Sequence, residues 1–122
     1  RALVDRDSEI KDSRILVLGL AYKKNVDDVR ESPAAEIMEL LRARGAKLDY
    51  SDPFVPRFPR MREHRFELES VALDARVLEG YDCVVLVTDH DAFDYDLIQG
   101  HARVIVDTRG RYRDKAPNVV RA

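Results

Sequence analysis

The stretch Arg14-Ile-Leu-Val-Leu-Gly-Leu20 is a short, continuous apolar run that is rich in branched side chains. Its length favours a β-strand buried on both faces, as the strands of parallel sheets are. Apolar residues then recur at helical spacing over Pro33–Arg44, and Lys47–Asp52 alternates like a half-buried strand. A strand, a helix and a strand joined by a right-handed crossover form one βαβ unit. This unit predicts an α/β fold built on a parallel sheet.

Local signals set the limits of the predicted helix. Ser32 is a residue type that caps helix N-termini, and Pro33 suits the first turn, where its missing N–H would have no partner. Gly45 follows the periodic stretch, and glycine commonly ends a helix. The pattern therefore predicts one helix between the two strands.

The rest of the chain continues this alternation with shorter elements. In chain order we expect a surface loop (Pro53–His64), a short extra strand (Phe66–Val71), a helix (Asp74–Gly80), a strand (Cys83–Thr88), a helix capped by Asp94 (Tyr95–Gly100), a strand (Arg103–Asp107) and its outgoing turn (Asp107–Gly110). Together they predict a Rossmann-like, three-layer α/β domain with a doubly wound, mostly parallel sheet of roughly four or five strands.

Length and composition exclude several functional classes. The chain has 122 residues, enough for one domain, and 21 basic against 23 acidic side chains give a net charge of −2. No excess of basic charge is present, so we expect no nucleic-acid partner. The apolar runs are too short to cross a bilayer, the amino end lacks a secretory signal, and one cysteine cannot form an internal disulfide. These observations predict a soluble, cytoplasmic domain without a membrane partner.

The first residues of the chain are polar and charged and have no strong periodicity. We therefore expect residues 1–12 to be a linker from an upstream region and residues 13–122 to form the domain. This organisation would make the chain part of something larger.

The most informative segment for function is the predicted connection between the first strand and the helix, Ala21–Ser32. It is longer than most such loops, which have about 2–6 residues, and it contains no glycine or proline. Lys23 supplies positive charge for an anion, the Tyr22 ring offers a face to a base or sugar, and Arg30 can grip a phosphate or carboxylate with two hydrogen bonds. Alternatively, the charges of this loop only pair with one another and stiffen it.

Arg109 follows the last predicted strand directly, on the same edge of the sheet as Lys23. Ligands of open α/β sheets bind at this edge, outside the carboxyl ends of the strands. By itself, Arg109 could equally be a solvated turn arginine. An ammonium and a guanidinium at neighbouring strand exits, beside the Tyr22 ring, would instead favour a nucleoside diphosphate.

Several signatures of reactive centres are absent from the sequence. Gly19 stands alone, so neither the Gly-x-Gly-x-x-Gly fingerprint nor a Walker-type loop is present. Cys83 begins an apolar strand, and we interpret it as a small buried hydrophobic residue. Asp89-His90-Asp91 could bind a metal ion, although capping of the next turn fits this motif better. The sequence by itself therefore predicts a binding domain without a catalytic residue and without a metal.

The loop and several later motifs together carry a resemblance to a known family. Gly19-Leu-Ala-Tyr-Lys-Lys-Asn-Val-Asp-Asp-Val-Arg-Glu-Ser-Pro33, Gly45-Ala46, Asp52-Pro-Phe-Val-Pro56, Thr88-Asp-His90 and Asp107-Thr-Arg-Gly110 occur in this order. The pattern closely resembles the C-terminal domain of the UDP-glucose/GDP-mannose dehydrogenase family, from Ile15 to the end of the chain. The last three motifs look most like the UDP-N-acetylglucosamine 6-dehydrogenase branch.

Enzymes of this family oxidise the C6 hydroxyl of the sugar to a carboxylate with NAD. The resemblance implies that this domain holds the nucleotide half of a UDP-sugar, with Tyr22, Lys23 and Arg109 as substrate-binding residues. It also implies that Arg30 reaches toward NAD, which would be bound mainly by a domain outside this chain. The implied partners are therefore the UDP-sugar, an NAD-binding domain and a central domain that forms the dimer.

The resemblance has a limit, because no residue here matches the family's catalytic cysteine or the lysine and asparagine that assist it. Cys83 is not assigned that role, and we expect the chain alone to be inactive. The alternative hypothesis is a separate Rossmann-like module that binds a phosphorylated ligand or a protein partner without redox chemistry.

Overall fold

The computed structural model describes residues 11–21, 33–59, 66–112 and 116–121, and the structural statements below concern these residues. Five strands form one sheet: β1 (Arg14–Leu18), β2 (Lys47–Ser51), β3 (Cys83–Leu86), β4 (Ile105–Asp107) and β5 (Val119–Arg121). Within the described residues three helices accompany them: α2 (Pro33–Ala43), α3 (Ala75–Glu79) and α4 (Tyr95–His101).

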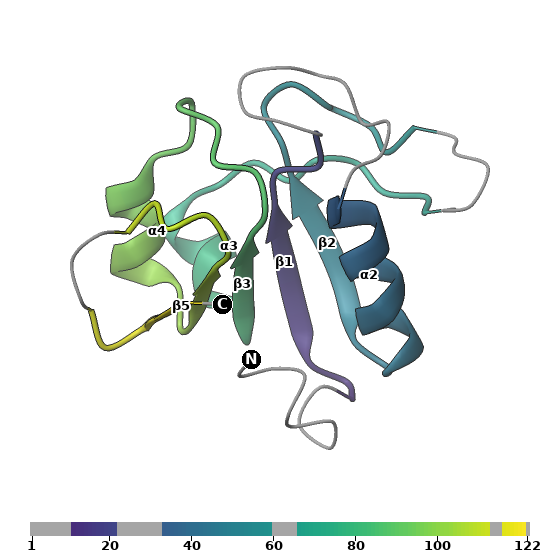
Figure 1. Cartoon of the computed structure of the whole chain (residues 1–122), viewed down its shortest axis with the longest axis horizontal. Coiled ribbons are helices and arrows are strands. Elements are labelled where there is room, and N and C mark those ends of the chain that lie inside the picture. Colours follow the sequence, from purple (N-terminus) through teal and green to yellow (C-terminus); the bar gives the residue numbers. More distant parts are fainter. Residues whose placement is uncertain (1–10, 22–32, 60–65, 113–115, 122) are drawn as a thin grey trace.

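The sheet is parallel throughout, in the order β2-β1-β3-β4-β5. Ile15 in β1 pairs with Leu48 on one side and with Cys83 on the other. The labelled arrows of β1, β2 and β3 point the same way in Figure 1, so their carboxyl ends lie together at the upper edge. The chain moves outward from β1 to β2, and in the opposite direction from β3 to β4. The topological switch point, where such sheets bind ligands, therefore lies between β1 and β3.

Side chains of the central strands are buried on both faces. Ile15 and Val17 pack on the side of α2, whereas Leu16 and Leu18 pack on the side of α3 and α4. Figure 1 shows α2 on one side of the strands and α3 with α4 on the other. This arrangement confirms the predicted three-layer, doubly wound α/β domain.

The predicted helix-end signals at Gly45 and Asp94 are confirmed, whereas Ser32, the predicted cap of α2, lies outside the described residues. Gly45 has a φ of +93°, a left-handed conformation that suits glycine, and its amide bonds back to the Arg42 carbonyl. The Asp74 and Asp94 side chains cap α3 and α4, accepting hydrogen bonds from the amides of Val77 and Leu97.

Two strand predictions need correction. Phe66–Val71 forms no strand, because its pairing is limited to one antiparallel bridge between Arg57 and Glu69 and a few isolated hydrogen bonds. Strand β5 is present although its two valines are too short a run to be predicted. Asn118 leads into it, and its side chain donates to the carbonyls of Gln99 and Ala102, which fixes the approach to β4.

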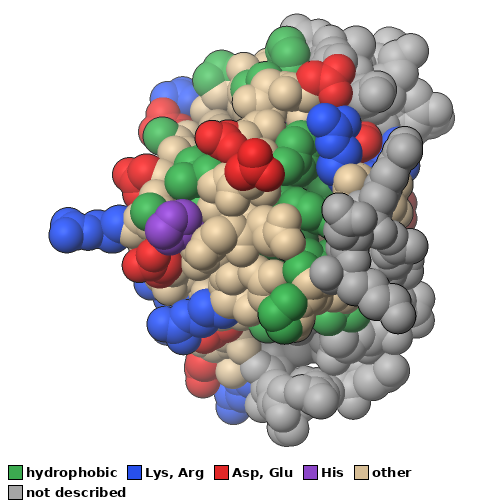
Figure 2. Space-filling model, turned by 90° about the vertical axis from the view of Figure 1, so that its left-hand side faces the viewer, with side chains coloured by type: hydrophobic (Ala, Val, Ile, Leu, Met, Phe, Trp, Pro, Cys, Tyr) green, Lys and Arg blue, Asp and Glu red, His purple; other side chains and the backbone are tan. Residues whose placement is uncertain are grey.

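The surface that carries α3 and α4 shows basic and acidic side chains interspersed, as Figure 2 illustrates. No helix in the part of the chain that the structure describes is long and apolar enough to span a membrane. Of the predicted linker, residues 1–10 lie outside the described residues. The amide of Asp12 donates to the Gly45 carbonyl, beside the amino end of the sheet.

Candidate functional site

Four strands end at one edge of the sheet, and the segments that leave them are joined by buried polar groups. We call residues 19–21, 52–54, 87–91 and 107–112 the carboxyl edge. Asp52, Thr88, His90 and Asp107 belong to it, and each is at most 1% exposed. Buried polar groups of this kind need partners, so they define the backbone geometry of the edge.

Asp52 directly follows β2 and is the centre of the largest of these networks. Its Oδ2 accepts hydrogen bonds from the amides of Leu20 and Ala21, at 2.7 and 3.0 Å, and contacts His90 Nε2 at 2.8 Å. Its Oδ1 accepts from the Phe54 amide at 2.8 Å. Burial by itself would raise the pKa of Asp52, but the hydrogen bonds from His90, Ala21 and Phe54 outweigh burial and hold this pKa below its usual range.

The exits of β1 and β3 approach each other very closely. Gly19 has a φ of +88°, and a β-carbon built there would lie 2.4 Å from the Thr88 carbonyl oxygen. The Thr88 hydroxyl donates to the Ala21 carbonyl at 2.6 Å. Glycine is therefore required at position 19 for the packing of two strand exits, rather than for the approach of a ligand.

Strand β4 ends in a turn that Asp107 fixes. Its carboxylate accepts hydrogen bonds from the amides of Arg109, Gly110 and Tyr112, each at 2.9 Å. The Thr108 hydroxyl donates to the Leu86 carbonyl at 2.7 Å, which ties this turn to the end of β3. The predicted turn Asp107–Gly110 is therefore confirmed, and the backbone of Arg109 is held in place.

Arg109 lies at the carboxyl edge with 45% of its side chain exposed. Its Nε lies 3.7 Å from Asp89 Oδ1, a loose ion pair that leaves much of the guanidinium accessible. Arg111 is held more firmly: its Nη1 lies 3.1 Å from Asp91 Oδ1, and its guanidinium lies 4.3 Å from the centre of the Tyr95 ring. The side chain suited to an anionic ligand here is therefore Arg109.

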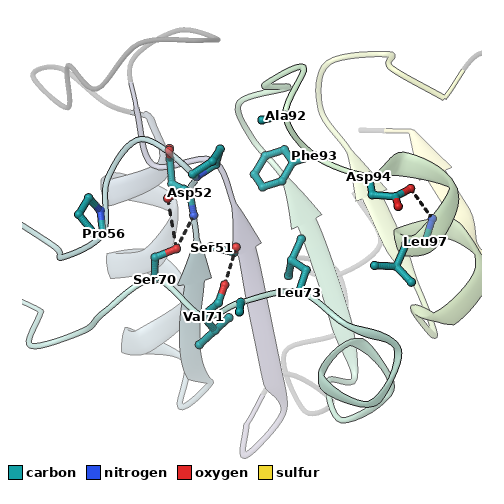
Figure 3. Close-up of a pocket in the computed structure, with 12 residues that line it drawn as sticks. Ser51, Asp52, Pro56, Ser70, Val71, Leu73, Ala92, Phe93, Asp94 and Leu97 are labelled. Carbon is teal, nitrogen blue, oxygen red and sulfur yellow. Dashed lines mark hydrogen bonds between the residues drawn. The ribbon is translucent and has the colours of Figure 1, made fainter.

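A pocket of about 470 Å³ lies beside Asp52, between the exit of β2 and the start of α4. Figure 3 shows Phe93, Leu73 and Leu97 along one side of it and Asp52, Ser51 and Ser70 along the other. The polar groups bond to neighbouring protein atoms, as in the hydrogen bond from the Ser51 hydroxyl to the Val71 carbonyl at 2.7 Å. The pocket thus offers mainly apolar surface next to the carboxyl edge.

Of the predicted site residues, Tyr22, Lys23 and Arg30 lie outside the described residues, so the structure tests only the position of Arg109. Its strand ends at the same edge of the sheet as β1, as expected. The expectation of neighbouring strand exits was wrong, because β3 lies between β1 and β4. Two strand spacings, about 10 Å, separate the two exits, and the apolar periodicity contained no information on strand order.

The three residues of the Asp89-His90-Asp91 motif have different partners. Asp89 and Asp91 face the guanidinium groups of Arg109 and Arg111, whereas His90 is fully buried against Asp52. Asp94 caps α4, as predicted, and in the turn that follows the motif the His90 carbonyl accepts a hydrogen bond from the Phe93 amide. Within the described ranges, no group of three acidic, histidine or cysteine side chains is arranged to hold a metal ion.

Cys83 is buried in β3, as predicted. Burial raises the pKa of its thiol to about 12, and the nearby Asp82 charge adds to this shift. A thiol of this kind stays protonated and unreactive at neutral pH.

The sequence did not predict the contact between Asp52 and His90, nor the ion pair of Arg111 with Asp91 and its packing on the Tyr95 ring. The motifs Asp52-Pro53 and Thr88-Asp-His90 stood out, but nothing in their spacing showed that their side chains meet. The sequence offered one signal for Arg111, which lies two residues beyond Arg109 and directly after the predicted turn.

A parallel sheet that winds in both directions from a switch point between β1 and β3 is a Rossmann-like domain, a class of fold that binds ligands at the carboxyl edge of its sheet. The chain belongs to the UDP-glucose/GDP-mannose dehydrogenase family, since residues 16–114 match the profile of that family's UDP binding domain. This match confirms the resemblance that the sequence motifs carried.

Curated relatives agree with this assignment, and a solved structure shares the fold. The chain is 37% identical over 84 residues to a UDP-N-acetyl-D-mannosamine dehydrogenase of Methanococcus maripaludis, covering 69% of this chain and 18% of that protein. It is 34% identical over 109 residues to an NDP-N-acetyl-D-galactosaminuronic acid dehydrogenase of Ralstonia nicotianae, covering 86% and 24%. The structure of a UDP-D-ManNAc dehydrogenase from Pyrococcus horikoshii shares the fold, with a TM-score of 0.70, 24% identity, and coverage of 98% and 28%. The chain thus spans about a quarter or less of its curated relatives.

Proposed function

We propose that this chain binds the uridine diphosphate part of a UDP-sugar at its carboxyl edge, for an NAD-dependent dehydrogenase that oxidises the sugar C6 hydroxyl to a carboxylate. The observation that supports this most is the half-exposed Arg109 guanidinium, held by the Asp107 turn at the edge where β1 also ends. Anchoring a remote diphosphate serves catalysis because it orients the reacting carbon.

Lys23 and Tyr22 would complete the site from the loop that follows β1. The exits of β1 and β4 are about 10 Å apart, so two long cationic side chains could reach a diphosphate from opposite sides. Such charge-assisted hydrogen bonds are among the stronger ones in proteins. In this proposal Tyr22, Lys23 and Arg109 bind substrate, and Arg30 reaches toward NAD.

NAD itself would be held elsewhere. A dinucleotide fingerprint needs glycines that let the backbone approach a pyrophosphate. Gly19 does not serve this purpose, because the space beside its α-carbon is filled by the Thr88 backbone. We propose that an NAD-binding domain and a central dimerisation domain are the partners of this chain. In this proposal residues 1–12 are the linker from the upstream region, and residues 13–122 form one domain. A cytoplasmic location fits this proposal.

The substrate that the sequence predicts is UDP-N-acetylglucosamine. The two relatives described above bear names that specify N-acetyl-D-mannosamine and N-acetyl-D-galactosaminuronic acid, whereas a further relative is a UDP-glucose 6-dehydrogenase; the proposal follows the N-acetylated names. Assays of NADH formation by the full-length dehydrogenase with UDP-N-acetylglucosamine and with UDP-N-acetylmannosamine distinguish the two sugars, since the proposal expects oxidation of the first.

Calorimetric titration of UDP into the chain tests the site. We expect Lys23→Ala and Arg109→Ala each to weaken UDP binding about tenfold or more, because each removes a charged hydrogen-bond partner. Two variants are matched controls: Lys47→Ala and Arg103→Ala remove exposed cations near the opposite edge, at the starts of β2 and β4.

The control variants are expected to bind UDP like the parent chain. The parent chain is expected to show almost no binding of NAD alone. If Lys23→Ala and Arg109→Ala also bind UDP like the parent, the assignment of these residues is wrong. If the parent chain binds no UDP at all, the proposal fails for this chain as a whole.

A further inference from the structure

Asp52 and His90 form a polar contact that is wholly buried at the carboxyl edge. The Oδ2 atom of Asp52 lies 2.8 Å from His90 Nε2, and neither side chain has any exposed surface. The two residues are 38 positions apart, one after β2 and the other after β3. Because Asp52 is ionised at neutral pH, Nε2 must carry the hydrogen and donate it.

A contribution to folding stability is not enough to explain a buried contact of this type. Replacing a buried ionic pair by apolar groups of the same volume is often neutral or stabilising. Its role therefore lies in the groups that it holds in place. The Oδ2 atom of Asp52 that contacts His90 also accepts hydrogen bonds from the amides of Leu20 and Ala21.

Asp52 thus joins the exits of three strands. Ala21 directly precedes Tyr22 and Lys23 in the sequence. His90 is adjacent to Asp89, whose carboxylate lies 3.7 Å from Arg109 Nε. The Asp52 carboxylate therefore fixes the backbone that directly precedes Lys23. Through His90 it also fixes the segment that contains Asp89, which contacts Arg109.

We propose that Asp52 and His90 are positioning residues of the nucleotide site, which set the placement of the β1 exit relative to Asp89 and Arg109. This inference rests on the proposed function of the edge. Neither residue touches the ligand; each acts through the groups that it holds.

The His90 ring also packs against Phe54 and Phe93, with centroid distances of 4.9 and 5.6 Å. A packing role and a positioning role therefore need variants that separate the ring from the donor. His90→Phe keeps an aromatic ring and removes the hydrogen that Asp52 accepts. His90→Gln removes the ring and keeps an N–H donor on a side chain of similar reach.

The test is calorimetric titration of UDP into the folded chain, with circular dichroism to establish folding. We expect His90→Phe to weaken UDP binding about tenfold or more, as removal of groups that orient ligands does at metal sites. His90→Gln is expected to retain most of the UDP binding, because its amide can still donate to Asp52. If His90→Phe does not fold, His90→Asn replaces it, because its amide is too short to reach Asp52.

The matched control is His101→Phe. His101 also contacts a carboxylate at 2.7 Å, that of Glu79, but this pair is exposed and joins α4 to α3. We expect its variant to bind UDP like the parent.

A double variant gives a second readout. If His90 acts partly through Arg109, the double variant His90→Phe with Arg109→Ala must lose less binding free energy for UDP than the sum of the losses in the two single variants. A purely structural defect would give additive losses.

The outcomes separate the two proposals. UDP binding at parental affinity in folded His90→Phe, or an equal loss in His90→Gln, overturns the positioning role while Arg109→Ala still weakens binding. If Arg109→Ala and Lys23→Ala bind UDP like the parent, the proposed function itself fails.

Discussion

Replacement of Gly19 by alanine probes the closest contact at the carboxyl edge. The backbone there has a φ of +88°, and the added β-carbon would lie 2.4 Å from the carbonyl oxygen and 2.7 Å from the amide nitrogen of Thr88. Left-handed backbone costs a residue with a β-carbon about 1–2 kcal/mol. Overpacking adds about 1–3 kcal/mol. We therefore expect Gly19→Ala to lower the free energy of unfolding by about 2–5 kcal/mol.

Two other glycines separate these contributions. Gly110 has a φ of +71° but nothing within 4 Å of the added β-carbon, so Gly110→Ala retains only the backbone strain, about 1–2 kcal/mol. Gly100 lies within α4, also with nothing within 4 Å. Gly100→Ala is expected to stabilise the fold by about 0.5–1 kcal/mol, since alanine is the better helix former.

Urea unfolding followed by circular dichroism measures all three variants against the parent, with the slope of the transition as a check on two-state behaviour. The order of stability is expected to be Gly100→Ala, parent, Gly110→Ala and Gly19→Ala. A loss for Gly19→Ala no larger than that for Gly110→Ala would refute the close approach of the two strand exits.

Three further predictions concern other groups. Burial raises the pKa of Tyr50 to about 12, above its usual value near 10; the unfolded chain therefore ionises first, and urea stability should be complete below about pH 10 and fall as the pH rises toward 12. A flat urea midpoint across that range would contradict this. Asp94→Ala removes the cap that accepts the Leu97 amide and should cost about 0.5–2 kcal/mol in urea unfolding. Cys83, with a pKa of about 12, should react with a thiol reagent only after urea unfolds the chain; rapid labelling of the native protein would show that β3 is accessible.

The sheet and its helices could be largely predicted because burial leaves a periodic record. The apolar run Ile15–Leu18 is buried on both faces, and the helical spacing of Ala34, Met38 and Leu41 reports the side of α2 that meets the sheet. Local chemistry fixed the helix ends, as the positive φ of Gly45 and the cap formed by Asp94 illustrate. Such signals depend on residues close together in the chain.

The carboxyl edge was harder to predict, because its contacts join residues that are far apart in the chain. Asp52 and His90 are polar residues, and polar residues are expected at the surface, yet both are buried because they bond to each other. Strand order is a similar case: no apolar pattern reveals that β3 separates β1 from β4. For the same reason, the positions of Lys23 and Arg109 relative to each other could not be obtained from spacing.

The most direct test of the nucleotide site is the map of backbone amide chemical shifts during titration of the ¹⁵N-labelled chain with UDP. We predict that the shifts concentrate at the carboxyl edge, at residues 19–21, 88–91 and 108–111. Amides at the opposite edge, such as those of Asp12, Gly45 and Asp82, should stay unchanged. Shifts that concentrate at that opposite edge instead would contradict the account.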